Sequence, residues 1–358
     1  MSEKKSRQLN MEILRIVAMF MIISLHYLDK GGILRDFSEK PSLFHEIAWI
    51  IEAFAMVSVN IYVLISGYFL AESEFKLKKL IMLWIQIILY SWIITGIVAI
   101  SGGQVINDKG IYDLIPLVLP VTGSHYWFAT IYVLMYACFP FMNKAIKAMD
   151  KKKHRTAIIV GVLIFSAWNT FLPMTIPVTD KDGMDICWFA ILYLIAAYLR
   201  KYGNEIKLNK WLSLAIYVLC SVLIYSLGKG LLLADMVVGK LGGFAENFYP
   251  YNSLFTLIGS VALFIFFMKS SFNMPKWIGK VILWASAGCF GVYLLHEHQL
   301  IRYEWPKLFN TAKYADTPLF LLNMIVSVVC VFIVGICIDY IRRLIVSLFM
   351  KIGGKKND

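Results

Sequence analysis

Long uninterrupted apolar segments recur along the whole chain and constrain its fold more than any other feature. Segments such as residues 78–101 and 318–341 reach about 20 residues, the length that a helix needs to cross the hydrocarbon core of a bilayer. Strands of a membrane barrel would instead alternate apolar and polar residues over shorter segments. The pattern therefore predicts an all-α, polytopic membrane protein.

The composition excludes the main alternatives to a membrane protein. Hydrophobic residues make up 59% of the 358 residues and charged residues only 16%, whereas a soluble domain has about 25% charged residues. A disordered chain would be poor in apolar residues and rich in charge. The net charge of +12 comes from basic interhelical loops and tails rather than from a separate basic stripe, so no nucleic-acid partner is expected.

The apolar segments and the basic loops together predict a topology of ten transmembrane helices. If the N-terminus is cytoplasmic, 24 of the 35 Lys and Arg residues fall on the cytoplasmic side and 10 fall in outer loops. This bias follows the positive-inside rule, and it predicts a single helical bundle with both termini in the cytoplasm. The expected spans are residues 10–28, 46–70, 78–101, 126–143, 155–173, 186–200, 210–227, 252–269, 281–299 and 318–341.

The first expected span carries three ionisable residues, which are costly in a bilayer and are therefore candidate site residues. Arg15 and His26 are separated by eleven helical steps of about 100°, so they share one face at an axial distance of about 16 Å. Glu12 lies one turn before Arg15 and can pair with it. One interpretation is that Arg15 extends to the membrane interface beside Glu12 and that His26 is a structural imidazole. The other is a polar stripe that holds a long anionic molecule entering from the cytoplasm and presents its reactive end to His26.

Polar groups in the second span and in the loop after it also have two interpretations each. Ser66 and Gly67 permit close helix packing, and the Ser66 hydroxyl is also a candidate ligand for a substrate. The loop after this span carries a cluster of three lysines, Lys76, Lys78 and Lys79. The cluster either serves only to orient the helices in the membrane or forms a clamp for phosphate groups.

Two later segments contribute aromatic and imidazole groups. Trp127, at the start of the fourth span, is a membrane anchor or a substrate contact. His296 and His298 form a His-x-His pair, but the pattern of a third zinc ligand is missing, so no metal is expected. His296 is better interpreted as a site residue facing an aqueous cavity or as a hydrogen-bonded structural residue.

The chain resembles the integral-membrane acyltransferases of the type 3 family over about residues 8–345. The family has an acidic residue, Leu-Arg, ten residues and then His in its first span, and this chain differs mildly by having Glu where many members have Asp. Its basic cluster consists of Lys where the family usually has Arg, and Lys acts on phosphate as a point charge. The matching residues are Glu12, Leu14-Arg15 and His26; Ile65-Ser66-Gly67-Tyr68; Lys76, Lys78 and Lys79; Trp127-Phe128; and Gly291, Tyr293 and His296.

The resemblance implies transfer of an acyl group, most often acetyl, from cytoplasmic acyl-coenzyme A to a hydroxyl of a cell-surface or lipid-linked carbohydrate. His26 would be the catalytic base or would form an acyl-histidine. Arg15, held by Glu12, would bind the anionic head of coenzyme A together with the lysine cluster. Candidates to polarise the thioester or to orient the acceptor are Ser66, Tyr293 and His296, and candidates to stack on sugar rings are Tyr126, Trp127 and Tyr249.

The resemblance thus implies a single acyltransferase domain over residues 1–358, in the cell membrane among lipids, with no separate soluble domain and no metal. Two other functions fit the apolar helices. A secondary transporter or exporter of a polar metabolite or lipid-linked sugar would also carry polar groups at mid-membrane depth. A non-catalytic sensor or assembly subunit would not need these motifs.

Overall fold

The structure of the chain is a computed structural model, and it describes residues 8–38, 42–106, 110–123, 125–172 and 182–354. Within these ranges all regular secondary structure is helical, and no strand occurs. The all-α prediction is therefore confirmed.

The helices follow one another with short connections, and several expected spans are divided into two elements. The elements are α1 (Leu9–Lys30), α2 (Leu43–Ala55), α3 (Val57–Leu70), α4 (Leu77–Ile100), η1 (Gly110–Asp113), α5 (Leu114–Val118), α6 (Trp127–Lys147), α7 (Lys151–Val162), η2 (Leu163–Ala167, a π-helical turn), α8 (Trp168–Phe171), α9 (Ile186–Tyr202), η3 (Gly203–Glu205), α10 (Lys210–Val238), η4 (Gly242–Phe248), α11 (Leu254–Met268), α12 (Lys276–Ser286), α13 (Cys289–His296), α14 (Glu304–Leu308), α15 (Thr311–Tyr314) and α16 (Phe320–Gly354).

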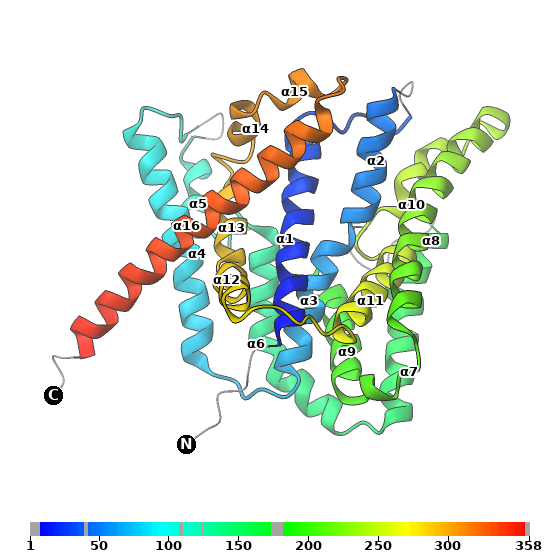
Figure 1. The fold of residues 1–358 in the computed structure, drawn as a ribbon, viewed down its shortest axis with the longest axis horizontal. Coiled ribbons are helices and arrows are strands. Elements are labelled where there is room, and N and C mark those ends of the chain that lie inside the picture. The colour runs from blue at the N-terminus through cyan, green and yellow to red at the C-terminus, as the bar shows by residue number, and fades with distance from the viewer. Residues whose placement is uncertain (1–7, 39–41, 107–109, 124, 173–181, 355–358) are drawn as a thin grey trace.

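Helix α1 lies at the centre of the bundle and packs against α2, α3, α11, α12, α13 and α16 (Figure 1). Glu12 in its first turn and Lys30 in its last turn complement the helix dipole. The helix ends where Gly32 adopts a left-handed conformation with φ of 68°, which glycine adopts without steric cost. The central position explains why a single helix can bring several polar groups to one site.

Among the described residues, seven helical segments are long and apolar enough to cross a membrane, and α12 with α13 forms an eighth if the pair, bent by 40°, is one span. One of the seven, Leu43–Leu70, joins α2 and α3 across a break at Met56. Two expected spans do not reach this standard. The first is the span expected at 252–269, where α11 has only 15 residues. The second is the span expected at 155–173, which begins in the basic first turns of α7. Residue 173, the last of that span, lies outside the described residues. The count of ten spans stays a prediction.

The start of α1 and the end of α16 lie on the same side of the bundle (Figure 1). In Figure 1, α1 begins at the lower side, α16 runs obliquely down to end on that side, and α4 also begins there. We call this the α1-start side, and the side where α1 ends at Lys30 the α1-end side. The arrangement is what two cytoplasmic termini would require, although which side faces the cytoplasm stays a prediction from the loop charges.

Candidate active site

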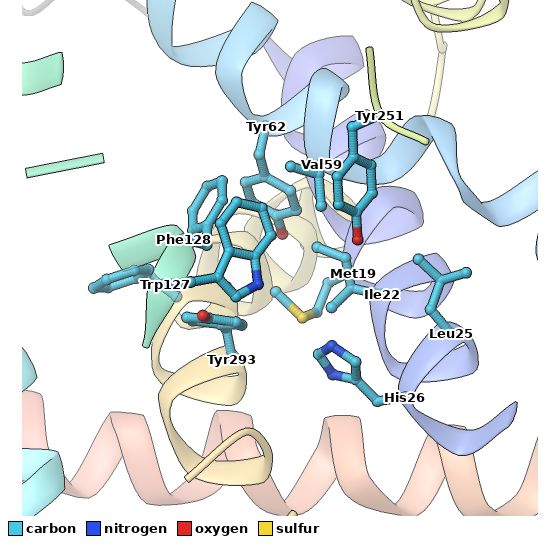
Figure 2. Close-up of a pocket in the computed structure, with 11 residues that line it drawn as sticks. Met19, Ile22, Leu25, His26, Val59, Tyr62, Trp127, Phe128, Tyr251 and Tyr293 are labelled. Atoms are coloured by element: carbon cyan, nitrogen blue, oxygen red, sulfur yellow. The ribbon is translucent and has the colours of Figure 1, made fainter. Parts of the chain in front are cut away.

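His26 faces a narrow cavity in the middle of the bundle. The cavity has a volume of about 30 Å³, on the order of the volume of one water molecule in the liquid. Figure 2 shows the imidazole projecting toward a space bounded by aromatic side chains, with the indole nitrogen of Trp127 and the hydroxyl of Tyr251 turned toward that space. The lining residues come from α1, α3, α6, α13 and the segment before α11: Met19, Ile22, Leu25, His26, Val59, Tyr62, Trp127, Phe128, Tyr251, Phe290 and Tyr293.

A chain of hydrogen bonds determines which nitrogen of His26 is free to take a proton. His296 Nδ1 lies 2.6 Å from the carbonyl oxygen of Val292, and a carbonyl can only accept, so the proton of neutral His296 is on Nδ1. His296 Nε2 is then an acceptor, and it lies 2.8 Å from His26 Nδ1. His26 therefore donates from Nδ1, and its Nε2 carries the unshared electron pair.

A carboxylate lies beside the same imidazole. Glu297 Oε2 is 3.3 Å from His26 Nδ1, and Glu297 Oε1 is 3.5 Å from the guanidinium of Arg302. Glu297 is buried, with 6% of its surface exposed. An imidazolium formed when His26 Nε2 accepts a proton would be stabilised by this carboxylate, and the stabilisation is large where water is excluded.

Aromatic contacts hold the wall opposite His26. Trp127 stacks on Tyr251 with ring centroids 5.8 Å apart, and Phe128 meets Tyr293 edge-on at 5.7 Å. Each such pair contributes about 0.5–1.5 kcal/mol beyond the burial of its surface. The Tyr293 hydroxyl is buried without a hydrogen-bond partner among the described residues, so it has a proton available for a bound substrate. Trp127 and Tyr293, predicted as substrate contacts, thus both line the cavity.

The polar stripe expected on α1 continues from the cavity toward the α1-start side. Met19 and His26 line the cavity, and Arg15 precedes Met19 by one turn of the continuous helix. Arg15 forms an ion pair with Glu12, which is buried. The Tyr62 hydroxyl donates to the backbone oxygen of Arg15 over 2.8 Å while its side chain lines the cavity. The stripe therefore has Arg15 at one end and His26 at the other.

The lysine cluster and Ser66 lie outside the cavity. Lys76, Lys78 and Lys79 are exposed at the start of α4 on the α1-start side (Figure 1). Ser66 is half-buried in α3 and does not line the cavity. A Cβ atom on Gly67 would lie 2.8 Å from Cβ of Ala196, so this glycine allows α3 and α9 to pack closely. No described contact joins the lysine cluster to Arg15.

Three of the imidazole and aromatic side chains considered in the sequence analysis have surroundings that differ from those expected. His296 contacts His26 rather than the cavity. His298 points elsewhere: its ring lies 4.4 Å from that of His125, and its Nε2 is 3.3 Å from the backbone oxygen of Ser91. Tyr126 is fully buried and donates to the backbone oxygen of Leu294. The His-x-His pair therefore separates into two unrelated hydrogen-bonded groups.

Sequence reasoning missed two residues of this site. Glu297, the middle residue of the His-x-His pair, is not among the predicted site residues, although a carboxylate within an apolar segment is itself a signal for a site. Tyr251 lies in a loop next to α11, and nothing in its local sequence indicates that it reaches the cavity. Its position is fixed by Asn60, which donates to its backbone oxygen over 2.8 Å.

A family model described as an acyltransferase domain matches residues 8–341. Neither a search of curated proteins nor a search of solved structures finds a match.

Proposed function

Because this chain belongs to the membrane acyltransferases of the type 3 family, we propose that it transfers a short acyl group, most often acetyl, from acyl-coenzyme A to a carbohydrate hydroxyl. The acceptor would be a cell-surface or lipid-linked carbohydrate, and the enzyme would act in the cell membrane with coenzyme A bound from the cytoplasm. Family membership favours acyl transfer over the transporter alternative.

The observation that carries the proposal is the free Nε2 of His26 at the edge of the cavity. In the reaction, Nε2 accepts the proton of the acceptor hydroxyl as the hydroxyl oxygen attacks the thioester carbon. The C–S bond then breaks, and the proton moves from the imidazolium to the leaving thiolate, so that coenzyme A departs as a thiol and His26 returns to its starting state. The base therefore needs no regeneration by another group.

Glu297 and Tyr293 have supporting roles in this scheme. Glu297 stabilises the positive charge on His26 while the tetrahedral intermediate exists. The Tyr293 hydroxyl is suited to donate to the developing oxyanion because it has no hydrogen-bond partner among the described residues. Stabilisation of this type is commonly the largest single contribution to acyl-transfer catalysis.

The donor would approach from the α1-start side. Arg15 and the exposed Lys76, Lys78 and Lys79 provide positive charge for the phosphates of coenzyme A, although Arg15 already pairs with Glu12. A thin pantetheine arm would then extend along the α1 face for the ~16 Å between Arg15 and His26. The narrow cavity suits an acyl group of about two carbons.

The test is thiol release from acetyl-coenzyme A in the presence of a carbohydrate acceptor, measured for the purified protein and for its His26→Ala variant. The variant is expected to lose about 10²–10⁴-fold in rate, the usual contribution of a general base, while its amount in the membrane stays normal. Retention of most activity would overturn the role of His26. Acid quenching during turnover, followed by mass spectrometry of the α1 peptide, separates base catalysis from an acyl-histidine route.

A further inference from the structure

One wall of the His26 cavity is formed by a residue of a turn. The other lining residues belong to α1, α3, α6 and α13, where helical hydrogen bonds fix the backbone. Tyr251 lies in the turn before α11 and has no such support. Its hydroxyl is nevertheless turned toward the same space as the imidazole (Figure 2). The position of this wall therefore depends on contacts from other elements.

A buried amide provides the strongest of these contacts. Asn60 Nδ2 donates to the backbone oxygen of Tyr251 over 2.8 Å and to the Ser260 hydroxyl over 3.2 Å. Asn60 Oδ1 accepts from Trp188 Nε1 over 3.1 Å. Asn60, Ser260 and Trp188 are fully buried, and burial of an amide is costly unless its polar atoms are paired. The amide thus joins α3, α9, α11 and the turn in one fixed arrangement.

The Tyr251 ring forms a boundary of the His26 cavity. The ring stacks on Trp127 with centroids 5.8 Å apart and an interplanar angle of 25°. Tyr251 also lines a neighbouring cavity that Trp49 and Tyr249 border. Displacement of the ring would join the two spaces, and water in the neighbouring cavity would then reach the imidazole.

Water is the competitor that an acyltransferase must keep from its thioester. The His26 cavity, with a volume of about 30 Å³, has room for on the order of one water molecule. In hydrolysis a water oxygen bonds to the acyl carbon, the C–S bond breaks, and one water proton passes through His26 Nε2 to the thiolate. The products are a carboxylic acid and coenzyme A as the thiol. Closed active sites prevent this side reaction.

We propose that Asn60, acting through Tyr251, closes the His26 cavity and directs the acyl group to a carbohydrate hydroxyl instead of water. This inference rests on the proposed function, since it deepens the acceptor specificity of that site. Asn60 does not itself line the cavity, so it is a positioning residue. Its amide holds the Tyr251 backbone, and the Tyr251 ring excludes water.

The first measurement is independent of catalysis and uses purified full-length protein. Diethyl pyrocarbonate transfers an ethoxycarbonyl group to the unshared electron pair of a neutral imidazole, and carbon dioxide and ethanol leave. Mass spectrometry of peptides gives the rate of modification of His26 relative to that of His154. His154 is fully buried on α7 and does not line the cavity, so it reports general loosening of the protein.

Asn60→Leu is expected to raise the ratio of His26 to His154 modification about fivefold, because a neutral hydrogen bond shifts an equilibrium by roughly 2- to 10-fold. Tyr251→Ala removes the ring itself and should raise the ratio at least as much. Tyr251→Phe keeps the ring and should leave the ratio near its original value.

Asn143→Leu is the matched control for Asn60→Leu. The Asn143 amide is also buried, donates to the backbone oxygen of Leu70 over 2.9 Å and accepts from the Tyr193 hydroxyl over 2.8 Å. No described contact joins it to Tyr251. The variant removes the same hydrogen-bonding group and should leave the modification ratio unchanged.

Thiol release from acetyl-coenzyme A without any carbohydrate measures hydrolysis. It should rise several-fold in Asn60→Leu and in Tyr251→Ala, and adding His26→Ala to either should return it to background. An unchanged modification ratio in both variants, an equal rise in Asn143→Leu, or a raised ratio without faster hydrolysis overturns the inference. Thiol release that is faster in both variants but unaffected by His26→Ala contradicts the proposed function and leaves the role of Asn60 in closing the cavity standing.

Discussion

His296 Nε2 lies 2.8 Å from Nδ1 of His26, so the tautomer of one imidazole determines the tautomer of the other. The backbone oxygen of Val292 fixes the proton of His296 on Nδ1. Two helices that are distant in sequence thereby leave the unshared electron pair of His26 on Nε2, beside the cavity. His296 acts through His26 and is a positioning residue.

Replacing His296 by Phe should therefore lower kcat while leaving KM for acetyl-coenzyme A nearly unchanged. The expected loss lies between about tenfold and 10⁴-fold, the upper figure being the effect of holding a catalytic histidine in the wrong tautomer. Steady-state thiol release measures both constants. His296→Gln should recover part of the rate, because its side-chain oxygen can accept from His26 Nδ1.

His298→Phe is the matched control for that variant, since His298 is equally buried but contacts His125 and Ser91 instead of His26. Its kcat per folded protein should stay near the original value. An equal loss of kcat in both variants, or no recovery in His296→Gln, would show that His296 has only a packing role.

Neutralising the basic groups on the α1-start side should weaken donor binding. Arg15→Ala and the combined Lys76→Ala, Lys78→Ala and Lys79→Ala variant should each raise KM for acetyl-coenzyme A several-fold with a smaller change in kcat. The physical reason is the loss of charge-assisted contacts to phosphate. Raising the salt concentration should lower the difference between the lysine variant and the original protein, because exposed charges are screened.

The control removes the same charge elsewhere on the protein. Lys152, Lys153 and Arg155 are exposed near the start of α7, and their combined replacement by Ala should leave KM unchanged. If this control raises KM as much as the lysine-cluster variant does, general surface charge and not a phosphate clamp explains donor binding. An unchanged KM in Arg15→Ala would support the interpretation that Arg15 only reaches the membrane interface.

Local sequence was sufficient to predict the polar face of α1 but not its partners. Glu12, Arg15 and His26 belong to one helix, and helical geometry alone relates them. Glu297 and Tyr251 reach the site through packing of α13 and the segment before α11 against α1, and these contacts join residues far apart in the chain. The spans were predicted from hydropathy, which does not detect the break at Met56 or the bend between α12 and α13.

The small cavity beside His26 should limit the length of the acyl group. Met19→Ala removes a fully buried side chain that lines the cavity, so the ratio of turnover with butyryl-coenzyme A to turnover with acetyl-coenzyme A should rise at least several-fold. The change should also destabilise the protein by about 2–5 kcal/mol. Competition between the two thioesters, analysed by mass spectrometry of the products, measures the ratio.

Met135→Ala is the matched control, because Met135 is as buried as Met19 but does not line the cavity. It should lower stability by a similar amount and leave the acyl preference unchanged. A shift toward butyryl in both variants would mean that loosened packing, and not the shape of this cavity, sets the preference.

Gly291 should be required for the position of α13, and through it for His296. A Cβ atom at Gly291 would lie 2.5 Å from Oδ1 of Asp339 and 2.5 Å from the Tyr90 hydroxyl oxygen. Asp339 is fully buried and cannot move freely, since Arg342 and Arg343 both bind its carboxylate, at 2.8 and 2.9 Å. Gly291→Ala should therefore cost about 1–3 kcal/mol of stability, as overpacking does, and lower Tm in detergent together with kcat.

Gly96→Ala in α4 is the control, because a Cβ at Gly96 meets no atom within 4 Å. It should leave Tm equal or slightly higher because alanine favours helix. An unchanged Tm and kcat in Gly291→Ala would show that α13 and Asp339 can separate without disturbing the histidine pair.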